Sequence, residues 1–331
     1  MNNKILIIAE AGGNHNGSIK NAYKLIDIAK KSGADYIKFQ TFRAETLVSK
    51  KAPKANYQKK SIKELSHYEM IKSLELSYEM HQKIIRYCKK KKIKFISSAF
   101  CIDSFNLLRK FNLDYIKIPS GEITNLPLLK HISKYKNDII LSTGMCNLKE
   151  INDAFKILKN KKRKIILLHC NTEYPTPLKD INMKAMLTLK EKFKVNVGYS
   201  DHSLGTEVPI VATALGAKVI EKHFTISKNM NGPDHASSLN PKELIHMVKV
   251  IRKTEIILGN SKKLVTKSEK KNKFIARKSL FALNDIEINE KFSTKNLVCL
   301  RPGYGISPMK ISNIYGKKSK KFYSKGQMIK F

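Results

Sequence analysis

Short apolar runs rich in β-branched residues alternate with amphipathic helical segments along most of this chain, and this alternation limits the fold more than any other feature. The runs predict strands at residues 5–10, 36–42, 95–100, 115–119, 139–143, 165–170, 195–199 and 219–224. The segments between them predict helices at residues 20–32, 78–91, 104–111, 127–134, 150–159, 183–193, 208–215 and 241–258. Eight such units fit an α/β fold of the (β/α)₈ TIM-barrel type better than a doubly wound sheet, which rarely has eight regular repeats. A nucleotide-binding glycine loop of the Rossmann or Walker type is not present.

The pattern ends near Gly259. We therefore predict a barrel domain over residues 1–259, a linker rich in Lys and Ser over 260–272, and a small second domain over 273–331. The last segment reads as short strands, turns and one-turn helices. So small a domain buries little apolar area by itself, and we expect it to need a partner surface.

The composition is that of a globular protein, with 42% hydrophobic and 27% charged residues among 331. No apolar run is long enough to span a bilayer, and the N-terminal apolar run is too short for a signal peptide. We expect a cytoplasmic protein without a membrane partner. Five widely spaced cysteines, with no C-x-x-C pair, predict free thiols rather than a disulfide framework or a thiolate zinc site.

The formal charge of +37 suggests a second class of function, nucleic-acid binding. The lysines, however, are spread along every helical segment, and no RNA-binding aromatic motif or zinc-finger spacing accompanies them. We interpret most of them as solvated helix faces whose long-range field attracts anionic substrates, and we expect no nucleic-acid partner. A gel-retardation assay at moderate salt tests the alternative.

Every predicted barrel strand ends in polar side chains, and in a barrel these ends share the face that carries the active site. Lys38 and Lys117 lie inside otherwise apolar strands. A buried lysine needs an anion, so each either binds an anionic ligand or pairs internally with Glu10 or Glu122.

Two consecutive predicted strands each bring a histidine to their carboxyl end. His202 follows the strand at residues 195–199, and His223 lies near the end of the strand at 219–224. With Asp201, Glu221 and Asp234 nearby, these imidazoles could hold Mn²⁺, Fe²⁺, Co²⁺ or Zn²⁺. The structural alternative, a histidine that only makes hydrogen bonds, stays open for each of them.

Several motifs together resemble the bacterial sialic acid synthase family, whose members make N-acetylneuraminate, legionaminate or pseudaminate. They are EAGGNHNG at residues 10–17, KFQT at 38–41, KIPSGE at 117–122, LSTGM at 141–145, HCNTEYP at 169–175, YSDH at 199–202, EKHFT at 221–225, GPD at 232–234 and RPG at 301–303. The resemblance covers nearly the whole chain, with motif order and spacing in agreement.

This resemblance implies a C-terminal antifreeze-like (SAF) domain and a domain-swapped homodimer. It also implies a transferase reaction, in which phosphoenolpyruvate condenses with an open-chain N-acetylated hexose and water to give a nine-carbon 2-keto acid and phosphate. The divalent metal is expected to be Mn²⁺, with Mg²⁺ and Co²⁺ as alternatives.

The resemblance also assigns roles residue by residue. His202 and His223 would bind the metal and, with Glu10 and Glu122 as proton carriers, form the catalytic set. The phosphoenolpyruvate site would comprise Lys38, Ser98, Lys117, Ser120, Ser142 and Ser200. The sugar site would comprise Glu10, Gln40, Asn56, Tyr174, Asp234 and, from the other subunit, Arg301.

Two places depart from the family pattern or vary within it. Ser97-Ser98-Ala99-Phe100 replaces the Ser-Thr-Pro-Phe of many relatives, which keeps a hydroxyl but loses the restraint of proline. The insertion around residues 50–58, where Asn56 or Gln58 would contact the sugar, is more similar to the neuraminate and legionaminate branches than to the pseudaminate branch.

Within the family we favour N-acetylmannosamine as the substrate over 2,4-diacetamido-2,4,6-trideoxymannose. The enzyme alternative is a barrel aldolase with Lys38 or Lys117 as a Schiff-base nucleophile. Its activity would survive chelation of metal, whereas the synthase activity would not.

Overall fold

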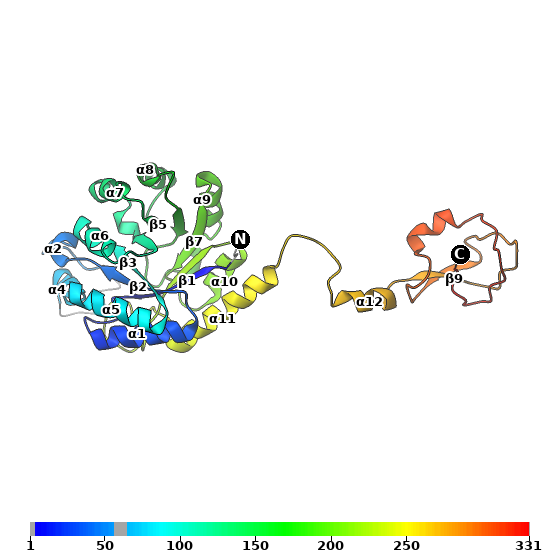
Figure 1. The fold of residues 1–331 in the computed structure, drawn as a ribbon, viewed down its shortest axis with the longest axis horizontal. Helices are drawn as coiled ribbons and strands as arrows, with labels where there is room; N and C mark the ends of the chain where they lie inside the picture. The colour runs from blue at the N-terminus through cyan, green and yellow to red at the C-terminus, as the bar shows by residue number, and fades with distance from the viewer. Residues whose placement is uncertain (1–3, 56–64, 331) are drawn as a thin grey trace. The chain divides into compact units, whose positions relative to one another are not determined.

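The computed structural model describes residues 4–55 and 65–330 (Figure 1). These form two compact units that divide between Gly259 and Asn260.

The first unit is a closed barrel of eight parallel strands arranged in sequence order, with β8 paired to β1. The strands are β1 (Leu6–Gly12), β2 (Tyr36–Thr41), β3 (Lys94–Ala99), β4 (Tyr115–Ile118), β5 (Asp138–Ser142), β6 (Ile165–His169), β7 (Asn196–Asp201) and β8 (Val219–His223). The (β/α)₈ barrel predicted from the alternation is therefore confirmed.

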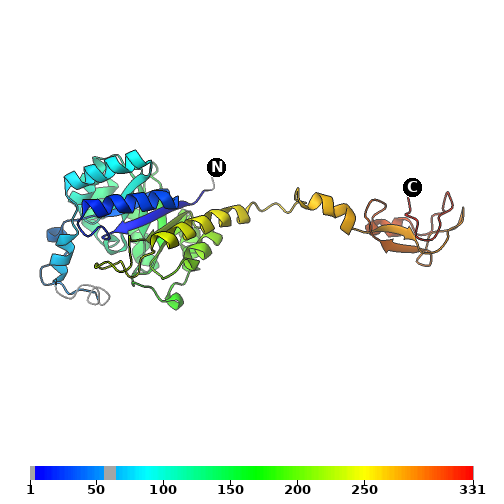
Figure 2. The ribbon, with the colours of Figure 1, turned by 90° about the horizontal axis from the view of Figure 1, so that it is seen from below.

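Helices follow the strands and form the outer layer. They are α1 (Ile19–Ser32), α5 (Tyr78–Lys91), α6 (Ile102–Arg109), α7 (Leu126–Ser133), α8 (Leu148–Leu158), α9 (Ala185–Phe193), α10 (Glu207–Ala214) and α11 (Pro241–Leu258). Figure 2 shows α1 between α5 and α11 along the wall, which agrees with its packing against both. Two further short helices, α2 (Ala44–Leu47) and α4 (His67–Ser73), lie between β2 and α5.

Local signals account for where the helices begin and end. Asn147 caps α8 and Asn240 caps α11, each in a reciprocal pair with a glutamate three residues later. Lysines fill the last turns of α1 and α5, where they complement the negative end of the helix dipole. This placement accounts for part of the large positive charge.

The core has two layers. The main apolar cluster fills the space between the strands and the helices, and a smaller one fills the inside of the barrel. Ile8, Ile96 and Ile140 of the inner cluster are buried near the starts and middles of their strands. Because apolar side chains occupy that part of the interior, the polar side chains gather at the carboxyl ends of the strands.

The second unit contains α12 (Glu269–Ala276), β9 (Ser279–Ala282), β10 (Leu297–Leu300) and the 3₁₀ helix η3 (Pro308–Asn313). Strands β9 and β10 pair in antiparallel fashion over a small core that includes Leu280, Phe292 and Tyr323. Helix α12 spans the position where the sequence analysis placed the end of the linker. All five cysteines are free, and no described helix is long and apolar enough to cross a membrane.

Candidate active site

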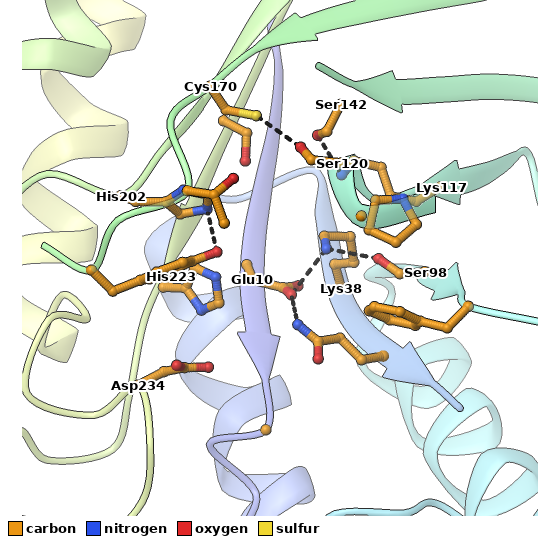
Figure 3. Close-up of a pocket in the computed structure, with 18 of the residues that line it drawn as sticks. Glu10, Lys38, Ser98, Lys117, Ser120, Ser142, Cys170, His202, His223 and Asp234 are labelled. Carbon is orange, nitrogen blue, oxygen red and sulfur yellow. Dashed lines mark hydrogen bonds and ion pairs between the residues drawn. The ribbon is translucent and has the colours of Figure 1, made fainter. Parts of the chain in front are cut away.

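The ends of the eight strands surround a cavity of about 270 Å³ (Figure 3). Twelve of the residues to which the family resemblance assigned a role in binding or catalysis line it: Glu10, Lys38, Gln40, Ser98, Lys117, Ser120, Ser142, Tyr174, Ser200, His202, His223 and Asp234. Glu10 lies between the two lysines on one side and His202, His223 and Asp234 on the other (Figure 3). The folded chain thus brings together residues drawn from every strand end of the barrel.

Both buried lysines have carboxylate partners. Lys38 Nζ lies 2.9 Å from Glu10 Oε1 and 3.5 Å from Glu221 Oε1. Lys117 Nζ lies 3.4 Å from the same Glu221 oxygen. Internal pairing with Glu10 is therefore present, whereas Glu122 pairs with neither lysine.

The lysines also donate to serine hydroxyls. Lys38 Nζ lies 3.1 Å from Ser98 Oγ, and Lys117 Nζ lies 2.7 Å from Ser142 Oγ. The Ser200 hydroxyl donates to Glu221 Oε1 over 2.9 Å. The result is a continuous network of cations and hydroxyl groups, almost closed to solvent, of the kind that binds a phosphate or a carboxylate.

The two lysines differ electrostatically. Burial opposes the charge on Lys38, but Glu10 and Glu221 outweigh it and raise its pKa. Burial lowers the pKa of Lys117, and Glu221 only partly offsets this. Lys117 is thus the cation with less compensation from the protein, and an anionic ligand would stabilise its charge.

The carboxylates differ in the same way. Burial alone would raise the pKa of Glu221, but Lys117 and Lys38 lower it to about 2. For Glu10, burial is the larger effect and raises its pKa to about 7, against the influence of Lys38. Glu221 is therefore a fixed anion, while Glu10 can exchange a proton near neutral pH.

Glu221 has a larger part in this site than the sequence analysis gave it. From the sequence it was considered only as a carboxylate near the two histidines. In the structure it forms ion pairs with both lysines and accepts a hydrogen bond from Ser200. The alternation of strand β8 could have revealed it, because Glu221 and His223 are two residues apart and therefore face the same side of the strand.

Asp201, considered as a metal neighbour, does not line the cavity in the part of the chain that the structure describes. Its carboxylate instead forms a buried ion pair with Lys222 and accepts from Ser203. It alternates with Ser200 and His202 along the chain, and so it faces the opposite side of the strand. That expectation was wrong.

The two histidines face each other, with ring centroids 5.5 Å apart. His202 Nδ1 donates to the Asn171 carbonyl, so its Nε2 carries the lone pair and accepts from Tyr174 Oη at 3.1 Å. His223 Nδ1 is buried without a hydrogen-bond partner in the described structure. Burial lowers the pKa of both, to about 4 for His202, which keeps the imidazoles neutral as metal ligation requires.

This pair fits a divalent metal in part. The described residues contain no group of three or more His, Cys, Asp or Glu arranged to hold an ion. The protein therefore offers two imidazole nitrogens, and water or substrate oxygens would have to complete the coordination shell. Such a mixed nitrogen and oxygen set suits Mn²⁺ or Co²⁺.

The remaining predicted site residues lie as follows. Gln40 Nε2 donates to Glu10 Oε1 over 3.1 Å, and Ser120 Oγ accepts from the Gly144 amide. Burial raises the pKa of Asp234 to about 6. Glu122 is half-buried, accepts from Asn125 and is not among the described cavity residues, so its predicted role remains a prediction.

The other two predicted sugar contacts are Asn56 and Arg301. Asn56 falls outside the described residues, as does Gln58. Arg301 belongs to the second unit, where its Nε donates to the Ala276 carbonyl.

Comparison with known proteins adds the family. The model of the NeuB family matches residues 25–263, and that of the SAF domain matches residues 277–331. The chain belongs to the NeuB family. The resemblance to sialic acid synthases noted from the motifs, with its C-terminal SAF domain, is thereby confirmed, and the chain is an enzyme of that family.

This NeuB-family chain is similar to individual relatives over most of their length. The N,N'-diacetyllegionaminic acid synthase of Campylobacter jejuni is 50% identical over 99% of both chains. That of Legionella pneumophila is 44% identical over 94% of this chain and 89% of its own. The crystal structure of N-acetylneuraminic acid synthetase from Leptospira borgpetersenii has a TM-score of 0.74 at 35% identity, and the match covers 82% of this chain and 90% of that one.

Proposed function

We propose that this enzyme condenses phosphoenolpyruvate with the open-chain form of an N-acetylated hexose and water, giving a nine-carbon 2-keto acid and phosphate. The observation that carries the proposal is the pair of buried lysines, which share one carboxylate and are surrounded by hydroxyl groups at the strand ends of the barrel. Membership of the NeuB family supports it.

Phosphoenolpyruvate would bind at Lys38 and Lys117. These two cations provide charge-assisted hydrogen bonds to its phosphate and carboxylate. The cavity serines that would complete this subsite are Ser98, Ser120, Ser142 and Ser200. Because the network already exists in the folded protein, little reorganisation would be needed as charge develops on the leaving phosphate.

His202 and His223 would hold the divalent metal, for which we propose Mn²⁺, with Mg²⁺ and Co²⁺ as alternatives. A bound ion of this type supplies Lewis-acid polarisation of the sugar aldehyde. The hydrogen bond from His202 to the Asn171 carbonyl fixes the tautomer whose Nε2 carries the lone pair, and a bound ion would replace Tyr174 as the partner of this nitrogen.

The reaction needs one proton delivered and one removed. The enol carbon of phosphoenolpyruvate bonds to the aldehyde carbon, whose oxygen takes up a proton. Water then adds to the cationic carbon beside the phosphate and loses a proton. In the resulting tetrahedral species the carbon–oxygen bond to phosphate breaks, the hydroxyl oxygen becomes the keto oxygen, and the hydroxyl proton leaves with the phosphate. Glu10, with a pKa of about 7 and a position between the lysines and the histidines, is suited to carry one of these protons.

The similarity to these relatives changes which sugar we propose as the substrate. Because two N,N'-diacetyllegionaminic acid synthases are 50% and 44% identical to this chain, we propose 2,4-diacetamido-2,4,6-trideoxymannose as the substrate rather than N-acetylmannosamine. N-acetylneuraminate synthesis is the second candidate, supported by the Leptospira structure.

We also propose a domain-swapped homodimer in which Arg301 of one subunit reaches the sugar bound in its partner's barrel. The exposed apolar side chains of α12, Phe274 and Ile275, support a partner surface for the second unit. A guanidinium in that position would clamp the sugar while the loop covers the mouth of the cavity.

Phosphate release from phosphoenolpyruvate tests the proposal, with Mn²⁺ and each of the two sugars, with and without EDTA. We expect metal-dependent release, faster with the trideoxy sugar. No release with either sugar, in protein shown to be folded, would overturn the synthase assignment. Chelation-resistant activity together with borohydride trapping on Lys38 or Lys117 would favour the Schiff-base alternative instead.

A further inference from the structure

One side of the active-site cavity is apolar. Five side chains form it, and we call them the α4 wall: Phe42, Met70, Ile71, Leu74 and Phe100. They come from the end of β2, from α4 and its C-cap, and from the end of β3. In the closed strand order, β2 and β3 lie opposite β6 and β7, which are followed by Tyr174 and His202. Beyond the strand ends, the cavity is thus apolar on the side of β2 and β3 and polar on the side of β6 and β7.

The α4 wall is built into the barrel. Leu74 packs against Gly13, where an added Cβ would lie 3.1 Å from its Cδ1. At Gly17, an added Cβ would lie 2.6 Å from the Ser73 carbonyl oxygen, so the end of α4 rests directly on the loop that follows β1. Phe42 and Phe100 pack edge to face at 5.8 Å. These contacts hold the α4 wall in place before any ligand binds.

The wall lies farther toward the mouth than the anion site. Lys38 and Lys117 stand inside their strands, whereas Phe42 and Phe100 follow the last residues of β2 and β3. The aldehyde carbon of the sugar must approach phosphoenolpyruvate at the lysines, as the proposed function requires. An extended six-carbon chain that began there would direct its C-6 end toward the mouth, which the α4 wall borders on one side.

We propose that the α4 wall contacts the C-6 end of the sugar and selects a C-6 methyl group over a hydroxymethyl group. This inference rests on the proposed function. It adds the residues that contact the C-6 end of the substrate and determine specificity there. A methyl group gains apolar contact with the wall. A hydroxyl group there finds no side-chain hydrogen-bond partner among the five wall residues and loses its bonds to water.

The test uses pairs of sugars that differ only at C-6. One pair is 2,4-diacetamido-2,4,6-trideoxymannose and its 6-hydroxy counterpart; the other is 6-deoxy-N-acetylmannosamine and N-acetylmannosamine. The measured quantity is the ratio of kcat/KM within each pair, from phosphate release. We expect the full-length enzyme to prefer the 6-deoxy member by about tenfold or more, the usual range for one group in an apolar pocket.

Ile71 is the position to change, because it is only half-buried and a substitution there should disturb the packing least. Ile71→Thr and Ile71→Val are nearly equal in volume, so their difference isolates one hydroxyl group. We expect Ile71→Val to keep the 6-deoxy preference and Ile71→Thr to reduce it by about three- to tenfold. A ratio within one protein is independent of how much of the enzyme is active.

Each outcome decides the matter. Phosphate release with equal kcat/KM for both members of a pair, or equal ratios in Ile71→Thr and Ile71→Val, would overturn the role of the wall and leave the proposed function intact. If none of the four sugars supports phosphate release by folded protein, the proposed function is overturned, and this inference with it.

Discussion

Asp201 and Lys222 form a buried ion pair on the outer side of the barrel wall, each one residue before a histidine of the candidate metal site. They are register partners in the pairing of β7 with β8. Lys222 also donates to the Ser203 carbonyl, and Ser203 donates to Asp201. This pair therefore ties together the two strand ends that carry His202 and His223.

Removing one member of this pair should destabilise the protein strongly. Lys222→Met leaves the Asp201 carboxylate buried without its cation, and we expect a loss of about 3–5 kcal/mol in the free energy of unfolding. Urea-induced unfolding measures it. In the double variant Lys222→Met with Asp201→Asn, the amide oxygen still accepts from Ser203 and no charge remains, so most of the loss should be recovered. Equal stability of the single and double variants would contradict the buried-charge explanation.

Glu221→Gln should make stability more dependent on anions. The substitution leaves Lys38 without one of its two carboxylates and Lys117 without its only ion-pair partner among the described residues. We expect the free protein to lose about 3–5 kcal/mol, and phosphoenolpyruvate or phosphate to raise the melting temperature more than in the wild type. Thermal unfolding with and without these ligands measures both effects. A smaller ligand-induced rise than in the wild type would argue against binding at the lysines.

Protonation of Asp234 should lower the catalytic efficiency with the sugar at acid pH. Burial raises its pKa to about 6, so the carboxylate that would accept hydrogen bonds from sugar hydroxyls is lost as the pH falls below that value. At saturating phosphoenolpyruvate, kcat/KM for the sugar should decline on the acid side of about pH 6. Asp234→Asn should lower kcat/KM and shift the pH at which kcat/KM declines on the acid side. The shift distinguishes Asp234 from the other titrating groups of the cavity. If the acid-side decline is unchanged in the variant, another group causes it.

His15 should make the barrel acid-sensitive. It is buried, its Nδ1 accepts from the Gly17 amide, and burial lowers its pKa to about 4 from an ordinary value of 6.5. The unfolded chain therefore binds the proton first, and stability present above pH 6.5 is lost as the pH falls toward 4, by up to about 3 kcal/mol.

His15→Asn offers a matched control, because its Oδ1 can replace the Nδ1 acceptor but does not titrate. Urea unfolding between pH 4 and 7 should show a shallower pH dependence in the variant. Some dependence should remain, since burial lowers the pKa of His81 and His235 as well. Identical slopes in the wild type and His15→Asn would exclude His15 as a source.

The barrel and many of the polar residues that line its cavity could be predicted from the sequence. The eight strand–helix units follow from the spacing of hydrophobic residues, which is a local property of the sequence. The carboxyl ends of the strands in a parallel barrel all lie at one face, whatever side chains they carry. That is why Lys38, Lys117, His202 and His223 could be placed near one another before the fold was known.

The pairing of the charged groups could not be predicted from the sequence. Lys38, Lys117 and Glu221 come from strands β2, β4 and β8, and their contacts depend on the register and closure of the barrel. The same register sends Asp201 outward to Lys222 and brings α4 against the loop after β1 to form an apolar wall. Sequence spacing carries no information on such distances, because they join residues far apart in the chain whose separation is set by packing.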